Sequence, residues 1–190
     1  MSEFDADAAA ALERAVEVLA GRRIALLTGA GVSTDSGIPD YRGDGAPRRA
    51  PMTGQQFLAD DGARRRYWIG SHLGWQRFST IAPNAGHRAI AALEQAGVAS
   101  GVVTQNVDGL HVRAGSRRVV DLHGTMSRVF CLDCGQGYAR DDISALLERD
   151  NPWLATSPEV ALGPDGDVRP ESADGFVVPQ CTVCGGMLKP

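Results

Sequence analysis

The sequence has 190 residues, of which 43% are hydrophobic and 22% are charged, so a folded domain with a small additional module is expected rather than a disordered chain. A net charge of -4 and a pI near 5.5 offer no long-range attraction to nucleic acid or to an anionic membrane surface, which makes both poor default partners. The sequence has neither an apolar stretch of the ~20 residues that span a bilayer nor an export signal, so we expect a cytoplasmic protein.

The N-terminal part of the sequence predicts a helix followed by a strand. Residues 6–20 place apolar side chains at helical spacing and stop at Gly21, which is typical of an amphipathic helix that leads into the fold. Residues 23–28 (RIALLT) are an apolar run that ends in GAGVSTDSG. This order is expected of a buried parallel strand that enters a glycine-rich turn.

The next two segments differ in character. Residues 40–54 are rich in Gly, Pro and Arg and are predicted to form a long functional loop. Residues 57–78 mix aromatic and apolar residues with charges, which indicates one or two helices that close over the edge of the sheet.

A second strand, helix, strand alternation follows. Residues 84–97 predict a helix that Asn84 caps and Gly97 ends. Residues 98–104 and 118–122 predict two further short strands, each ending in polar residues. The fold class is therefore α/β, with a partial doubly wound parallel (Rossmann-like) sheet whose ligand chemistry lies at the carboxyl ends of its strands.

Four cysteines form two CxxC pairs in the last third of the chain: Cys131 with Cys134, and Cys181 with Cys184. Each pair can present two thiolates from one turn, and four sulfurs close a tetrahedron around zinc without an open position for water, so the predicted zinc is structural. Four unliganded thiols or a redox pair are the alternatives.

The segment that carries these cysteines predicts one helix, at residues 141–149, among several prolines and glycines. Such a module has too little core to be stable without an ion. We therefore predict two domains, with residues 1–128 as the Rossmann-like nucleotide-binding portion and residues 129–190 as the zinc-binding module.

The turn Gly29-Ala30-Gly31 is a weak signal by itself, because glycines at a strand end also serve simple chain reversal. The third glycine, Gly37, comes six residues after Gly31 and so departs from the GxGxxG fingerprint of dinucleotide-binding proteins. The backbone amides of such a turn could still hold a pyrophosphate.

Four motifs in a fixed order carry a family resemblance: GAGVSTDSGIPDYR at 29–42, TQNVDGLH at 104–111, HG at 123–124, and the two CxxC pairs. In this order they resemble the sirtuin family over nearly all of the chain. The resemblance is closest to class II sirtuins, which include a mitochondrial member, because Tyr41 stands where many sirtuins have Phe.

The resemblance implies an NAD-dependent protein-lysine deacylase that binds NAD and an acylated-lysine protein. Tyr41 would lie near the nicotinamide ribose, and Asp108 can accept a hydrogen bond from the carboxamide. Without the other motifs, TQNVDG would be interpreted as an Asx turn. The implied cofactor-binding residues are Gly29, Ala30, Gly31, Ser33, Asp40, Tyr41, Arg42, Gln105, Asn106, Val107 and Asp108.

His123, at the end of the third predicted strand, is the implied general base, since an imidazole with a pKa of about 6.5 can take a proton at neutral pH. The resemblance implies that His123 activates a ribose hydroxyl and that nicotinamide, free lysine and O-acyl-ADP-ribose are the products. His72 and His87 are interpreted as packing residues. His111 is interpreted as structural support for the 104–111 loop.

The sequence ends at Lys189-Pro190, directly after the zinc module, where sirtuins continue into the second half of the sheet. We therefore expect a C-terminally truncated chain with an exposed strand edge and an exposed apolar face. The alternatives are a mono-ADP-ribosyltransferase or lipoamidase of the same family, or a non-catalytic zinc- and NAD-binding module. The acyl group stays open, although the class II resemblance favours one other than simple acetyl.

Overall fold

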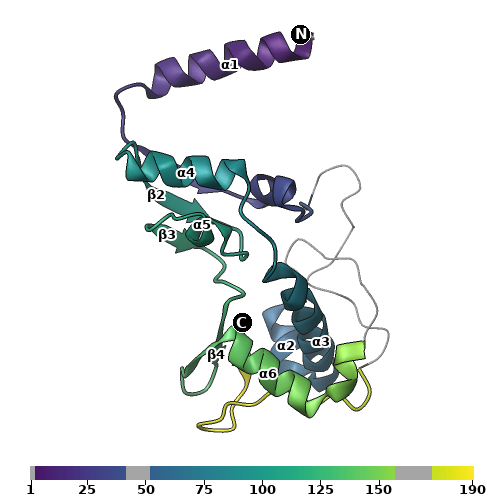
Figure 1. The fold of residues 1–190 in the computed structure, drawn as a ribbon. Helices are drawn as coiled ribbons and strands as arrows, with labels where there is room; N and C mark the ends of the chain where they lie inside the picture. Colours follow the sequence, from purple (N-terminus) through teal and green to yellow (C-terminus); the bar gives the residue numbers. More distant parts are fainter. Residues whose placement is uncertain (1–2, 42–51, 157–172) are drawn as a thin grey trace.

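A computed structural model describes residues 3–41, 52–156 and 173–190 of the chain. Figure 1 shows a small parallel sheet with a helix across it, a second group of helices below, and helix α1 (Glu3–Leu19) standing clear of the sheet. The predicted N-terminal helix is confirmed. Its apolar side chains are largely exposed, as at Leu12 (66%) and Val16 (60%), so no described residue covers that face.

The parallel sheet consists of the three predicted strands, β1 (Ile24–Thr28), β2 (Ala99–Thr104) and β3 (Val119–Asp121). The strands lie in the order β1-β2-β3 and both pairings are parallel. The last residues of the three strands pair with one another, Thr28 with Thr104 and Thr104 with Asp121. The carboxyl ends of all three strands therefore meet at one edge, as the sequence predicted.

Strands β2 and β3 approach each other closely at Gly101. A Cβ atom at this position would lie 2.7 Å from the carbonyl oxygen of Arg118, and the residue has a φ of +154°. The same carbonyl accepts a hydrogen bond from the N–H of Val102 at 2.8 Å. A residue without a side chain is thus required here for the two strands to pair.

Helix α4 (Ala85–Gln95) crosses one face of the sheet, as Figure 1 shows. Its N-terminus is held by a capping box between Asn84 and His87, which confirms the predicted cap. The Asn84 side chain also donates a hydrogen bond to the carbonyl of Val32 at 2.7 Å. The cap therefore joins α4 to the turn that follows β1.

The opposite face of the sheet is apolar and open. Leu27, Val103 and Val120 pair across the three strands and so share one face. Leu27 is 68% exposed and Val120 is 56% exposed. No described helix covers this face, so the described residues show one layer of helices where a complete doubly wound sheet has two.

One or two helices were predicted at residues 57–78, and the structure has two, α2 (Gly54–Ala59) and α3 (Asp61–Phe78). The surface against which they pack differs from the prediction. They bury their apolar side chains against the cysteine-bearing segment instead of closing over the edge of the parallel sheet. The buried cluster consists of Phe57, Trp68, Ile69, Val129, Cys131, Ile143, Leu147, Leu154, Phe176, Cys181 and Leu188. Only the last turn of α3 turns toward the sheet, where Phe78 packs with Ile38 and Leu110.

The cysteine-bearing segment contains a small antiparallel sheet of order β5-β4-β6 and one α-helix. Its elements are β4 (Arg128–Cys131), β5 (Gly137–Ala139), α6 (Arg140–Asp150), the 3-10 helix η2 (Pro152–Thr156) and β6 (Leu188–Lys189). Helix α6 confirms the predicted helix at 141–149. The domain boundary after residue 128 stays a prediction, and the shared core groups α2 and α3 with this segment.

Within the described residues, no helix combines the length and the apolar character that a membrane crossing requires.

Candidate functional site

A polar cavity lies at the carboxyl edge of the parallel sheet. After β1 the chain forms the 3-10 helix η1 (Ala30–Ser36), and the loop after β2 lies opposite to it. Between them is a cavity that opens to solvent. Its lining residues are Ala30, Ser33, Ile38, Tyr41, Gln105, Asn106, Val107 and Asp108.

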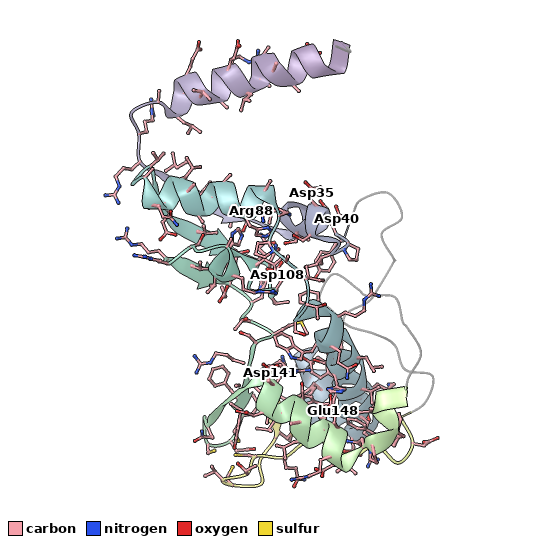
Figure 2. The ribbon with its side chains drawn as sticks, viewed as in Figure 1. Asp35, Asp40, Arg88, Asp108, Asp141 and Glu148 are labelled. Carbon is pink, nitrogen blue, oxygen red and sulfur yellow. The ribbon has the colours of Figure 1, made fainter. Side chains whose placement is uncertain are left out.

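Three polar side chains of the cavity bind one another. The Ser33 hydroxyl donates to Oδ2 of Asp108 at 2.7 Å, and the Asn106 amide donates to the Ser33 oxygen and to the Gly29 carbonyl, both at 3.1 Å. The N–H of Leu110 donates to the other Asp108 oxygen at 2.8 Å. The side-chain positions are therefore fixed by the protein before any ligand arrives. Figure 2 shows Asp108 level with the parallel sheet and apart from helix α6 below.

A second set of hydrogen bonds fixes the strand ends beneath the cavity. The Thr28 hydroxyl donates to Thr104 Oγ1 at 2.9 Å, and Thr104 Oγ1 also accepts from the N–H of Asn106 at 3.1 Å. Nε2 of His111 lies 2.9 Å from Thr28 Oγ1. Because the Thr28 proton is used for Thr104, the His111 imidazole is the donor to Thr28. This contact supports the interpretation of His111 as a structural residue of the loop.

Two buried histidines lie behind the cavity. The rings of His87 and His111 are 4.9 Å apart, and Nε2 of His87 lies 3.4 Å from the Ser33 hydroxyl. Both side chains are at least 98% buried. Burial lowers the pKa of both imidazoles from the ordinary value of 6.5, against a smaller opposing effect of Asp108. The neutral form of each histidine is therefore favoured in the folded protein.

The predicted base His123 lies in the turn after β3, at the same edge of the sheet as the cavity. It is exposed, whereas His72, His87 and His111 are buried. The backbone N–H of Leu122 donates to the Thr104 carbonyl at 2.9 Å, which holds this turn beside the strand that leads to Asn106. The role of His123 stays a prediction.

The structure brings most of the predicted cofactor-binding residues together. Seven of them line the cavity: Ala30, Ser33, Tyr41, Gln105, Asn106, Val107 and Asp108. Gly29 contributes its carbonyl to Asn106, Gly31 and Asp40 are not among the lining residues, and Arg42 lies outside the described residues. Ile38 lines the cavity but was missed, since an isolated apolar residue in a loop gives no signal of a binding role. Binding of NAD by these residues stays a prediction.

The four cysteines converge at the other end of the molecule. Their sulfur atoms all lie within 4.8 Å of one another, with 3.6 Å between Cys131 and Cys184 and 3.7 Å between Cys134 and Cys181. Four thiolates at about 2.3 Å from one zinc ion would be about 3.8 Å apart in a tetrahedron. The cluster therefore fits a structural zinc, as the two CxxC pairs predicted.

The two halves of the cysteine cluster have matching backbones. In each, the glycine after the second cysteine donates its N–H to the carbonyl of the first, from Gly135 to Cys131 at 3.0 Å and from Gly185 to Cys181 at 2.8 Å. These glycines have φ values of +75° and +74°, a left-handed conformation that other residues rarely adopt. The turn geometry explains why both CxxC pairs are followed by glycine.

Parallel strands with a polar cavity at their carboxyl ends place the molecule among the Rossmann-like α/β proteins. The sequence profile of the Sir2 family matches residues 29–190, and the chain belongs to this family.

The curated relatives are named as NAD-dependent protein deacetylases or deacylases. The chain is 52% identical over 179 residues to "NAD-dependent protein deacetylase 1" of Mycobacterium avium, which covers 92% of this chain and 64% of the relative. It is 45% identical over 173 residues to an NAD-dependent protein deacylase of Monosiga brevicollis, covering 88% of this chain and 56% of that protein. The chain thus spans about three-fifths of the length of these relatives.

Solved structures of the family have the same fold. One is a complex described as "Sir2-p53 peptide-NAD+", with a TM-score of 0.64 and 28% identity, covering 94% of this chain and 62% of that chain. Another is a Sir2 homologue mutant in complex with ADP-ribose, with a TM-score of 0.64 and 31% identity, covering 94% of this chain and 61% of that one. The similarity includes the α/β sheet that was predicted from the sequence.

Proposed function

We propose that this chain carries the nicotinamide end of the NAD site and the zinc module of an NAD-dependent protein-lysine deacylase. The observation that carries the proposal is the hydrogen-bonded set of Ser33, Asn106 and Asp108 in the cavity at the carboxyl edge of the described sheet. Family membership and the names of the relatives support the same activity.

The cavity suits the polar end of a nicotinamide nucleoside. Each carboxylate oxygen of Asp108 accepts one internal hydrogen bond and keeps a lone pair that can accept from a carboxamide N–H. Asn106 and Gln105 carry amides that can bind ribose hydroxyls. Ile38 and the half-exposed ring of Tyr41 supply apolar surface for the planar ring. This division of polar and apolar contacts favours recognition of nicotinamide and its ribose.

His123 is proposed as the general base. It is the one exposed histidine of the four in the chain, and it lies at the edge of the sheet where the cavity opens. A neutral imidazole there can accept the proton of a ribose hydroxyl and later release it to solvent. NAD supplies the ADP-ribosyl group to which the acyl group is transferred. The proposed products are nicotinamide, free lysine and O-acyl-ADP-ribose.

The acyl group and the class within the family are further parts of the proposal. The names of the relatives include both deacetylase and deacylase, which supports activity on acetyl-lysine and on longer acyl chains. Assignment to class II rests on Tyr41 and its neighbouring motif. A series of acyl-lysine peptides of increasing chain length would rank these substrates directly.

The test is nicotinamide release from NAD by the purified chain, with and without an acetyl-lysine peptide. Replacing His123 by Ala is expected to lower peptide-dependent turnover by about 10²–10⁴-fold while NAD binding is retained, because only the proton acceptor is removed. Leu122→Ala is the matched control, since Leu122 is an exposed neighbour in the same turn without an ionisable group.

An Asp108→Asn variant separates recognition from proton transfer. It should weaken NAD binding as well as turnover, because the amide replaces one of the two accepting oxygens by an NH2 group, which leaves one oxygen for Ser33, the Leu110 N–H and the carboxamide. Unchanged turnover of the His123 variant would remove the base assignment. NAD binding without peptide-dependent release in the parent chain would instead favour a binding module.

A further inference from the structure

The side chain of Tyr138 reaches the cysteine cluster from a different part of the chain. Tyr138 lies in β5, 43 residues before Cys181, and its hydroxyl oxygen is 3.1 Å from Sγ of Cys181. The same oxygen accepts a hydrogen bond from the backbone N–H of Thr182 at 3.1 Å and lies 3.1 Å from the Thr182 hydroxyl. The phenol is therefore fixed by three contacts at the second CxxC pair.

The other contacts of the phenol oxygen allow its proton to point at Cys181. The phenol oxygen has one proton and two lone pairs, and one lone pair accepts from the Thr182 N–H. The other can accept from the Thr182 hydroxyl, which leaves the phenol proton for the sulfur of Cys181. A zinc-bound cysteine is a thiolate, and hydrogen bonds to a charged acceptor are stronger than those between neutral groups. A zinc-bound Cys181 has no proton to donate, so Tyr138 would be the donor in this contact.

Cys131 is the natural comparison within the same cluster. It opens the first CxxC pair as Cys181 opens the second, and both cysteines are 3% exposed. The Cys131 sulfur accepts a weak backbone hydrogen bond from Cys134 at 3.5 Å, whereas Cys181 lies against the phenol. Backbone N–H groups of Val183 and Cys184 also act on the Cys181 sulfur, so the phenol is an additional hydroxyl donor at one of two sulfurs that are equally buried.

We propose that Tyr138 is a supporting residue of the zinc centre, which donates a charge-assisted hydrogen bond to the Cys181 thiolate. The bond fixes the orientation of that ligand and draws electron density from its sulfur. Because the ligand is held in place, zinc is lost more slowly. Because electron density is drawn from the sulfur, Cys181 is less nucleophilic than Cys131. The proposal concerns the zinc centre only and does not depend on the proposed deacylase activity.

Zinc release gives the first test. The zinc-loaded chain and a Tyr138→Phe variant are mixed with an excess of a chromogenic chelator, and the rate of zinc transfer is followed by absorbance. Because loss of an outer-shell partner typically costs about 10–100-fold in metal affinity, release from the variant should be faster by about that range. Thr182→Val is the matched control, since it removes the neighbouring hydroxyl but keeps the backbone N–H and the phenol. Its release rate should match that of the parent chain.

Alkylation by iodoacetamide gives the second test, read by mass spectrometry at each cysteine. The thiolate sulfur attacks the CH2 carbon, the C–S bond forms as the C–I bond breaks, and iodide leaves. In the parent chain, the exposed Cys134 and Cys184 should react first and Cys181 last. In Tyr138→Phe, Cys181 should accelerate while Cys131 keeps its rate.

Two results would overturn the proposal. Equal acceleration of Cys131 and Cys181 would mean that the variant only loosens or unfolds the module. Unchanged zinc release and unchanged Cys181 alkylation would mean that the phenol makes no effective bond to the thiolate.

Discussion

The two ends of this molecule are held together by different interactions. Around the zinc site, α2, α3, α6 and the antiparallel strands enclose one large apolar cluster and four thiols. Around the cavity, the apolar cluster is small (Ile38, Phe78, Leu110 and Met126), and the buried polar side chains Ser33, His87, Thr104 and His111 lie beside it. Figure 2 shows the positions of the two ends, with Asp141 and Glu148 on α6 below and Asp108 above.

The two kinds of interaction indicate that the zinc end contributes mainly to stability and the cavity end mainly to recognition. An apolar core with a metal depends on volume and on the bound ion, whereas a network of buried polar groups depends on protonation and geometry. The zinc end should therefore respond to loss of metal and to cavities. The cavity end should respond to acid. Three experiments follow, from the largest expected effect to the smallest.

Loss of the metal should have the largest effect. Cys181→Ser removes one thiolate from the cluster, and structural zinc sites contribute about 10–16 kcal/mol of apparent binding free energy in zinc-finger peptides. We expect the variant to lose zinc and the segment around β4, β5 and α6 to exchange its amide hydrogens rapidly, while α4 and β2 stay more protected. Metal analysis and hydrogen exchange measure both effects. A variant with unaltered melting and full zinc content would contradict the four-thiolate site.

A cavity in the apolar cluster should have the next largest effect. Leu147→Ala truncates a side chain that is 1% exposed and should cost about 2–5 kcal/mol of unfolding free energy. Leu27→Ala makes the same change on the open face of the parallel sheet and should cost no more than about 0.5 kcal/mol. Urea denaturation measures both. Equal costs would show that another part of the protein covers the open face in solution.

Acid should have a smaller and graded effect. The folded-state pKa values of His72, His87 and His111 are lowered by burial, so the unfolded chain takes up protons first as the pH falls below about 6.5. Their stabilising contribution is complete above pH 6.5 and is lost as the pH falls toward the lowered pKa values. The loss is at most about 1.4 kcal/mol per pH unit for each proton.

The pH experiment has an internal comparison. The charged groups that act on His87 and His111 are Asp108, Asp121 and Arg88, and His87 also lowers the pKa of His111. Glu148 and Arg140 act on His72 near the zinc end. Replacement of His111 by Gln keeps a hydrogen-bond donor near Thr28 but removes the titration. Thermal melting of this variant between pH 7 and pH 5 should show a shallower slope than the parent chain. An identical slope would exclude His111 as a source of the acid sensitivity.

The regular elements of this fold could be predicted because their signals are local. Strands β1, β2 and β3 each follow from an apolar run bounded by polar or glycine residues, and α4 follows from its cap and its periodicity. The cysteine cluster was predictable for the same reason, since two CxxC pairs define their ligands by spacing alone.

The parts that could not be predicted depend on contacts between distant segments. The aromatic residues of α3 indicate a buried face but do not say which surface covers it, and that surface proved to be the zinc module. Arg140 begins α6 and has the sequence signature of a solvated charge. Yet it is 1% exposed, donates to Ser71 at 3.0 Å and lies over the ring of Trp68. The contact between Tyr138 and the cysteine cluster could not be predicted either, because Cys181 lies 43 residues further along the chain.

Gly101 makes the spacing of the site sensitive to a single methyl group. Alanine at this position would press its side chain against the carbonyl of Arg118, and β3 would have to move away from β2. The turn with Leu122 and His123 follows β3 directly, while Asn106 follows β2. A mutation remote from the cavity would thus change the separation between the proposed base and the Asn106 amide that is proposed to bind ribose. The activity of variants at position 101 would consequently measure how far His123 and Asn106 can move apart before the proposed reaction slows.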